Sequence, residues 1–142
     1  MANLVVDSSV AVKWFVVEPY STEARRILDD YQSGALSFLA PDLINAEFGN
    51  IVWKKHLFQG LDAADAQAII DSFRTLRFAL TPTAALLDDA FKIALAHRRT
   101  VYDSLYLALG ARESCQVVTA DEKLANAVGA AYPNLIWLAN WP

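Results

Sequence analysis

Five short apolar runs, separated by helical patterns and bounded by polar or turn-forming residues, most constrain how this chain can fold. Runs of this length suit strands buried on both faces of a sheet. The longer segments between them carry apolar residues at the i, i+3, i+4, i+7 spacing of amphipathic helices. This alternation predicts an α/β domain with a short, mainly parallel central sheet. The predicted strands cover residues 4–6, 36–40, 77–80, 117–119 and 135–138.

The helices follow from the same periodicity and from residues that begin or end a helix. Ser8 or Ser9 can cap the first helix, Ser21 the second and Asp62 the fourth, while Gly34 stops the second. Core packing is the first explanation for the tryptophans of the first and third helices, Trp14 and Trp53. The predicted helices cover residues 10–15, 21–33, 42–58, 62–73, 83–94, 102–113 and 121–128.

Length and charge restrict the class of protein. With 142 residues, the chain has the size of one domain, and we expect a single domain over residues 1–142. No apolar run approaches the ~18 residues that a membrane span needs, so we expect no membrane segment and a cytoplasmic protein. The net charge of −4 argues against a module that binds nucleic acid by bulk electrostatics. It does not exclude a nuclease whose acidic site holds cations.

Four acids stand in apolar surroundings where a carboxylate is unusual. Asp7 and Asp121 each follow a predicted strand, and the carboxyl ends of parallel strands open on one crevice. Glu47 shares a helical stripe with Leu43, and Asp103 opens the most apolar helix of the chain. Any one of these acids alone is explained by helix capping or by the helix dipole. Four together would repel one another unless a divalent cation compensates their charge.

The chemistry that suits such a cluster is metal-assisted hydrolysis. Carboxylate oxygens favour Mg²⁺ or Mn²⁺, which often act on phosphate substrates. The chain has neither a GxSxG motif nor a P-loop, and His56 and His97 lie among basic residues near helix ends, as surface histidines do. A phosphoaspartyl phosphatase needs a second Asp two residues after the first, where this chain has Ser9. Hydrolysis of a phosphodiester by an activated water is therefore the predicted reaction.

The four acids lie in four ordered segments that span nearly the whole chain. The segments are Val6-Asp7-Ser8-Ser9, Pro41-x-Leu43-x-x-Glu47-x-x-Asn50, Tyr102-Asp103-Ser104-x-Tyr106-Leu107-Ala108 and Thr119-Ala120-Asp121-Glu122-Lys123. In this order they resemble the PIN-domain family, and within it the VapC-type ribonuclease toxins of bacterial toxin–antitoxin pairs. One such tetrapeptide is weak evidence, whereas four at these spacings are specific.

The resemblance implies an endoribonuclease with the three-layer α/β/α sandwich of PIN domains. It also implies that an acidic quartet binds Mg²⁺ or Mn²⁺, formed by Asp7, Glu47, Asp103 and Asp121. Ser8 and Thr119 are then hydroxyls that line the site, and Asn50 is a polar support. Lys54 shares the helical stripe of Glu47 and is the best-placed lysine to guide the RNA backbone.

The resemblance further implies partners: an RNA substrate, a second copy in a homodimer, and a small VapB-like antitoxin that blocks the site. Two other functions stay open at this point. Housekeeping RNA-processing PIN nucleases share the same acids, and a PIN-like module can bind RNA or protein without turnover. The complete quartet favours a nuclease, and the short chain favours the toxin.

Overall fold

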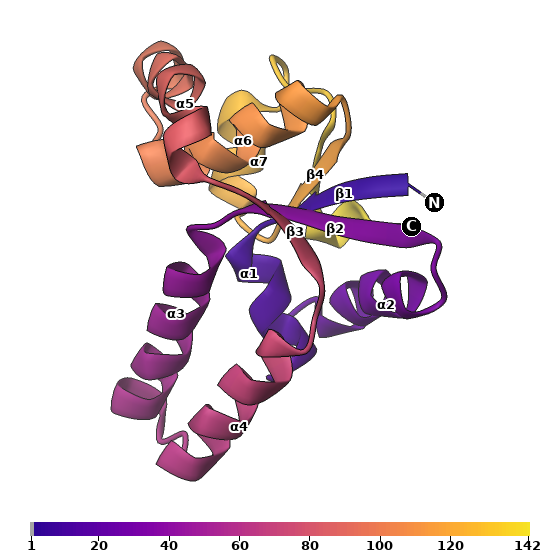
Figure 1. The fold of residues 1–142 in the computed structure, drawn as a ribbon, viewed down its shortest axis with the longest axis vertical. Coiled ribbons are helices and arrows are strands. Elements are labelled where there is room, and N and C mark those ends of the chain that lie inside the picture. Colours follow the sequence, from indigo (N-terminus) through magenta and orange to yellow (C-terminus); the bar gives the residue numbers. More distant parts are fainter. Residues whose placement is uncertain (1) are drawn as a thin grey trace.

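A parallel sheet of five strands forms the centre of the computed structural model, which describes residues 2–142 (Figure 1). Its strands lie in the order β3-β2-β1-β4-β5, and every neighbouring pair is parallel. The strands are β1 (Ala2–Val6), β2 (Leu36–Pro41), β3 (Phe78–Thr81), β4 (Gln116–Thr119) and β5 (Leu135–Trp137). The mainly parallel sheet is thus confirmed, with each predicted strand in place.

Helices cover both faces of this sheet, so the predicted α/β/α sandwich is confirmed. Helix α6 packs on β1, β2 and β4 with α5 outside it, and α2 packs on β2 from the opposite face (Figure 1). The helices are α1 (Ser8–Ala11), α2 (Ser21–Gln32), α3 (Ile44–Gln59), α4 (Ala63–Arg74), α5 (Thr83–His97), α6 (Val101–Glu113) and α7 (Glu122–Val128). Two short 3₁₀ turns complete the chain, η1 (Val12–Trp14) and η2 (Leu138–Asn140). Across residues 2–142, no helix combines the length and apolar character needed to cross a bilayer.

Two predicted helix caps are wrong, for a local reason. Asp7, not Ser8 or Ser9, occupies the N-cap position of α1, because the chain turns into the helix directly after β1. Ser21 is the first residue of α2, and its hydroxyl bonds back to the preceding loop by accepting from Glu18 N (2.9 Å). The cap predicted at Asp62 is confirmed, since its carboxylate accepts from Ala64 N at 3.2 Å.

The two tryptophans expected in the core differ in their exposure to solvent. Trp14 is buried, stacks on Phe38 with ring centroids 5.0 Å apart, and donates from Nε1 to the carbonyl oxygen of Ala24 at 2.8 Å. Trp53 is 53% exposed, so its assignment to the core was wrong. It lies on α3, which with α4 forms a helical pair that extends away from the sheet (Figure 1). Only part of the surface of such a pair can face the core.

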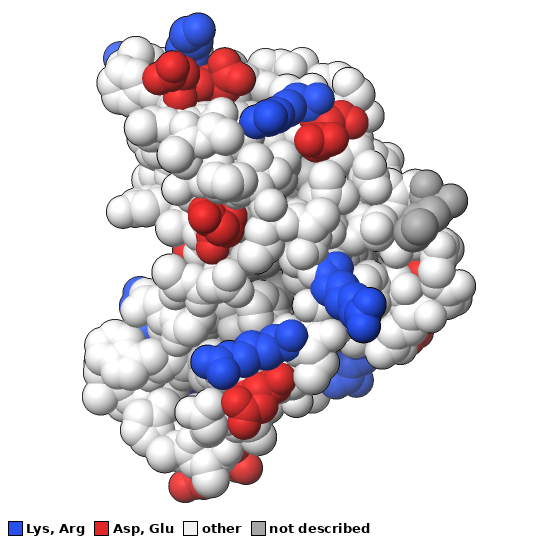
Figure 2. Space-filling model, viewed as in Figure 1, with Lys and Arg blue, Asp and Glu red and all other residues white. Residues whose placement is uncertain are grey.

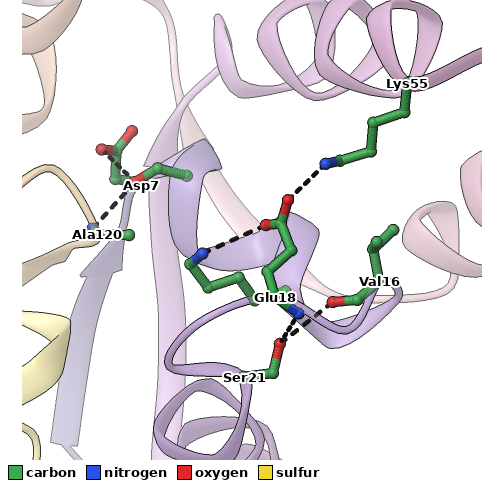
Figure 3. A network of polar contacts seen from close by, with 8 residues as sticks. Asp7, Val16, Glu18, Ser21, Lys55 and Ala120 are labelled. Atoms are coloured by element: carbon green, nitrogen blue, oxygen red, sulfur yellow. Dashed lines mark hydrogen bonds and ion pairs between the residues drawn. The ribbon is translucent and has the colours of Figure 1, made fainter. Parts of the chain in front are cut away.

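An ion cluster fastens this helical pair to the chain that follows α1 (Figure 3). Glu18 accepts from Lys55 Nζ of α3 at 2.5 Å and from Lys13 Nζ of η1 at 3.3 Å. The side chains of Lys13 and Lys55 are only 11% and 8% exposed. Burial raises the pKa of Glu18, but the hydrogen bonds and charges of the two lysines outweigh burial and hold this pKa below its ordinary value. The cluster therefore ties the second half of α3 to η1 and to the chain that follows it.

The order of the strands determines where a site can lie. The chain passes from β1 outwards to β2 and β3, and then crosses to β4 on the other side of β1. The carboxyl ends of β1 and β4 therefore flank the point where the strand order reverses, and ligands bind there in open α/β sheets. Close packing of α6 on β4 fixes the adjacent helix, because a Cβ atom at Gly110 would overlap the side chain of Val117.

Candidate metal centre

Four acids from four elements stand around the carboxyl ends of β1 and β4. Asp7 follows β1 directly, and Glu47 lies in the first turn of α3. Asp103 lies in the first turn of α6, and Asp121 is the N-cap of α7, two residues beyond the end of β4. The parallel sheet thus accounts for the convergence of segments far apart in the sequence.

Asp7 is the most enclosed of these acids, with 9% of its surface exposed. Its Oδ2 accepts from Thr119 Oγ1 at 2.8 Å and from Ser9 Oγ at 2.9 Å. Among the side chains of residues 2–142, its Oδ1 has a single long contact, 3.4 Å from Ser8 Oγ. One carboxylate oxygen is thus held firmly by hydroxyls of the protein, and the other is available to a ligand.

Glu47 has a similar division between its two oxygens. Its Oε1 accepts from Tyr106 OH at 2.6 Å and lies 3.4 Å from Ser8 Oγ. Ser8 therefore bridges Asp7 and Glu47, and Tyr106 connects α6 to α3. Burial raises the pKa of the Tyr106 hydroxyl, and the charges of Asp7 and Glu47 raise it further, so this hydroxyl remains a donor.

Asp103 and Asp121 are more accessible than Asp7. Thr100 caps α6 by accepting from Asp103 N at 3.1 Å, which fixes the backbone beneath the Asp103 carboxylate. Asp121 caps α7 through its Oδ1, which accepts from Leu124 N at 3.2 Å. Its backbone N donates to Thr119 Oγ1 at 3.1 Å, so Thr119 links Asp121 to Asp7.

The electrostatics of the cluster favour a cation. Burial raises the pKa of Asp7, and the hydrogen bonds from Thr119 and Ser9 do not reverse that rise. Burial also raises the pKa of Glu47 and of Asp103, and in both cases the charge of Asp7 raises the pKa further. Within residues 2–142, no lysine or arginine forms an ion pair with these three carboxylates. They are the kind of group whose negative charge a divalent ion stabilises.

The acids surround the site without forming a closed cage. In the part of the chain that the structure describes, no three His, Cys, Asp or Glu side chains converge closely enough to hold a metal directly. Magnesium is commonly held by one or two carboxylates together with waters and substrate phosphates, and such binding fits an open cluster of oxygen donors. The donor set therefore fits Mg²⁺ or Mn²⁺ held by a subset of the four acids.

The other predicted site residues divide into two groups. Ser8 and Thr119 are buried and contact the acids through their hydroxyls. Asn50 and Lys54 are exposed on α3, and neither side chain hydrogen-bonds to the four acids within residues 2–142. Three residues along an α-helix bring a side chain back to within about 60° of the first, so Asn50 lies near the face of Glu47 but is exposed to solvent.

Two polar residues of the site were not predicted as such. Tyr106 lies in a run of apolar residues on α6, where an aromatic residue is ordinarily core, and its hydroxyl shows its role only in three dimensions. Ser9 was assigned to the helix start, yet its hydroxyl donates to Asp7 and accepts from Ala120 N at 3.1 Å (Figure 3). The signal for Ser9 was its position two residues after Asp7, where a side chain can reach back to the carboxylate.

The raised pKa of Asp7 predicts how metal-free stability changes with pH. Because the pKa of Asp7 is raised on folding, the folded protein holds this proton more tightly than the unfolded chain does in the pH range between the unfolded pKa, about 4, and the folded pKa. This stabilisation is complete below the unfolded pKa and is lost as pH rises through the folded pKa. We expect the free energy of unfolding in EDTA, taken as wild type minus Asp7→Asn, to fall from pH 4 towards neutrality. Urea unfolding at a series of pH values measures it, and a difference that rises with pH contradicts the assignment.

Two comparisons of the sequence with known proteins agree. A family model described as PIN domain matches residues 4–129. Ribonuclease VapC3 of Pyrobaculum aerophilum is 34% identical over 128 residues, which are 87% of this chain and 92% of that protein. Each of the four acids lies inside the matched range.

Solved structures share the fold across nearly the whole chain. A Pyrobaculum aerophilum protein superposes with a TM-score of 0.69 at 22% identity, covering 97% of this chain and 92% of its own. A toxin–antitoxin complex from Klebsiella pneumoniae superposes with a TM-score of 0.64 at 13% identity, covering 95% of this chain and 97% of the matched chain. VapBC2 from Rickettsia felis, solved with a DNA fragment from its promoter, superposes with a TM-score of 0.63 at 15% identity. The match covers 95% of this chain and 96% of the matched chain. At these identities the superpositions show the fold alone.

Proposed function

Because the chain belongs to the PIN-domain family, we propose that it is a Mg²⁺- or Mn²⁺-dependent endoribonuclease whose reaction takes place among the four acids. The observation that carries the proposal is the set of carboxylates on separate elements, Asp7, Glu47 and Asp103, whose pKa values burial and mutual repulsion raise. The relative named as a ribonuclease supports RNA as the substrate. The direct test is cleavage of RNA by the purified protein with and without EDTA.

The proposed mechanism assigns the chain's residues to holding and orienting charge. A divalent cation, when bound, supplies the positive charge that eases deprotonation of water and balances the charge developing on the phosphate. Thr119 and Ser9 fix one oxygen of Asp7, and Tyr106 fixes one oxygen of Glu47. The second oxygen of Asp7 then has only the long Ser8 contact, and that of Glu47 has no donor within residues 2–142. No nucleophilic side chain is needed, because water attacks phosphorus and the leaving oxygen takes up a proton.

RNA binding in this proposal is local. Figure 2 shows acidic and basic side chains mixed on the face in view, without a continuous basic patch. The net charge of −4 agrees with that distribution. We assign the main attraction for the phosphate to the occupied acidic site, and propose exposed Lys54 on α3 as an additional contact to the RNA backbone.

The cellular role we propose is that of a toxin paired with a small VapB-like antitoxin. The relative Ribonuclease VapC3 and the fold shared with a toxin–antitoxin complex support this role. The discriminating observation is a small upstream reading frame that encodes a DNA-binding N-terminus and a disordered tail. Its absence favours a housekeeping RNA-processing nuclease.

We also propose that residues 1–142 form one domain and that two copies form a homodimer. One sheet and one family match, over residues 4–129, support the single domain. An exposed apolar stripe on α5 supports a protein contact, since Leu87, Phe91 and Leu95 are 52%, 53% and 67% exposed. The mass of the purified protein in solution tests the dimer.

Metal binding predicts a thermal shift. At a cation concentration 100 times the dissociation constant, linkage stabilises the folded protein by about 2.7 kcal/mol, which is about 5–10 °C for a domain of this size. We expect Mg²⁺ or Mn²⁺ to raise the melting temperature of the wild type and to have a much smaller effect on Asp7→Asn. Differential scanning calorimetry at matched ionic strength measures both. Equal shifts in the two proteins indicate unspecific ion effects and contradict the site.

A further inference from the structure

The orientation of Glu47 depends on a hydroxyl from another helix. Tyr106 of α6 donates to Glu47 Oε1 of α3 at 2.6 Å, a length typical of a strong hydrogen bond from a neutral hydroxyl to a carboxylate. Ser8 Oγ lies 3.4 Å from the same oxygen and 3.4 Å from Asp7 Oδ1. A serine hydroxyl has one proton to share between these acceptors, whereas the proton of Tyr106 OH goes to Glu47 among residues 2–142. Tyr106 is therefore the main partner of Glu47.

The other oxygen of Glu47 is free of such contacts. Among residues 2–142, no donor forms a hydrogen bond with Glu47 Oε2. Tyr106 itself is 3% exposed, and its ring is part of the hydrophobic core. A buried ring has little freedom to move, so its hydroxyl is a fixed point for the longer and more flexible glutamate side chain.

Repulsion between Glu47 and the neighbouring carboxylates explains why Glu47 needs the Tyr106 hydroxyl to hold it in place. Asp7 and Asp103 carry charge of the same sign near Glu47, and a glutamate with three rotatable bonds can swing away from them towards solvent. Glu47 is only partly buried, so packing alone does not prevent that movement. A donor on the inner side of the carboxylate opposes it.

We propose that Tyr106 is a positioning residue that holds Glu47 by Oε1 and presents Oε2 to the cation of the proposed ribonuclease site. The inference rests on the proposed function, because it assigns a role towards that cation. Outer partners that orient metal-binding side chains typically contribute 10–100-fold to metal affinity or activity. Tyr106 thus acts through Glu47 and does not touch substrate.

The test is the affinity of RNA-free protein for Mn²⁺, measured by the electron paramagnetic resonance of free Mn²⁺ and by calorimetric titration. We expect Tyr106→Phe, which keeps the ring and removes the hydroxyl, to weaken Mn²⁺ binding about 10–100-fold. Raising the Mn²⁺ concentration should restore most of the RNA cleavage of this variant. Tyr102→Phe is the matched control, because Tyr102 is an exposed tyrosine of the same helix, and it should bind Mn²⁺ as the wild type does.

A double-mutant cycle that combines Tyr106→Phe with Glu47→Gln distinguishes positioning of the Glu47 carboxylate from a role of Tyr106 in core packing. If Tyr106 acts through the Glu47 carboxylate, Tyr106→Phe has no further effect on Mn²⁺ affinity in the Glu47→Gln background. A purely structural role lowers the melting temperature while the folded protein keeps wild-type affinity, and that result overturns the inference but leaves the ribonuclease proposal standing. Wild-type protein that binds no Mn²⁺ overturns both. Ser8→Ala, with Tyr106 intact, should weaken binding less than Tyr106→Phe does.

Discussion

Replacing Asp7 by Asn should lower the rate of metal-dependent RNA cleavage by at least about 10³-fold. The site supplies several kcal/mol of charge stabilisation in the transition state through its cation, and each 1.36 kcal/mol is a factor of ten. Asp7 is central to the cluster, because its charge raises the pKa of both Glu47 and Asp103 and its own side chain is 9% exposed. The measurement is the cleavage rate of a labelled RNA in saturating Mg²⁺.

The same substitution should leave the metal-free protein as stable as the wild type or more stable. Burial disfavours the charged form of Asp7, and the amide of Asn is neutral and of similar size. Asp88→Asn is the control, since Asp88 is exposed on α5 and should retain both activity and stability. Cleavage by Asp7→Asn at the wild-type rate contradicts the assignment. If Asp7→Asn is instead much less stable than the wild type, its loss of activity is explained by unfolding and the assignment is also contradicted.

The second large effect is on stability, at the cluster of Glu18 with Lys13 and Lys55. Glu18→Ala leaves two nearly buried ammonium groups without an anion, and breaking a buried pair in this way costs about 3–5 kcal/mol. Because the cluster joins α3 to η1, the loss should reduce the free energy of unfolding of the whole protein. Urea denaturation at neutral pH measures it.

An unequal response to the two sides of the cluster distinguishes this account from a generic surface effect. Lys55→Met removes one of two cations, and Lys13 still pairs with Glu18, so its cost should be clearly smaller than that of Glu18→Ala. Glu113→Ala is the control, an exposed acid at the end of α6. Equal losses for Glu18→Ala and Glu113→Ala contradict the structural role of the cluster.

Most of the fold was accessible from the sequence, because local signals and the global arrangement agree. The apolar runs at 4–6 and 117–119 end at polar residues, and the rule for parallel sheets then places Asp7 and Asp121 at one crevice. The errors are local. Asp7 took the N-cap position from Ser8 and Ser9, and Trp53 lies on a helical pair that extends beyond the sheet.

The contacts of the site were less predictable, because they depend on packing between distant elements. Tyr106 is 59 residues from Glu47, and an aromatic residue in an apolar helix gives no sign of a polar partner. Lys55 follows Lys54 in the sequence, yet Lys55 is buried against Glu18 while Lys54 is exposed. Helical phase and the position of a loop decide which lysine is enclosed, and composition does not contain that information.

RNA cleavage by the purified, partner-free wild-type protein, assayed before and after chelation of divalent cations, decides whether the four acids form a metal-dependent nuclease site. We expect cleavage in Mg²⁺ or Mn²⁺, loss of cleavage in EDTA and recovery when metal is added back. Asp7→Asn should not cleave RNA at a comparable rate under any of these conditions. We also expect products without a 2′,3′-cyclic phosphate, because water rather than the 2′-hydroxyl attacks phosphorus. Cleavage that persists in EDTA, or cyclic phosphate ends, would contradict metal-dependent hydrolysis at this site.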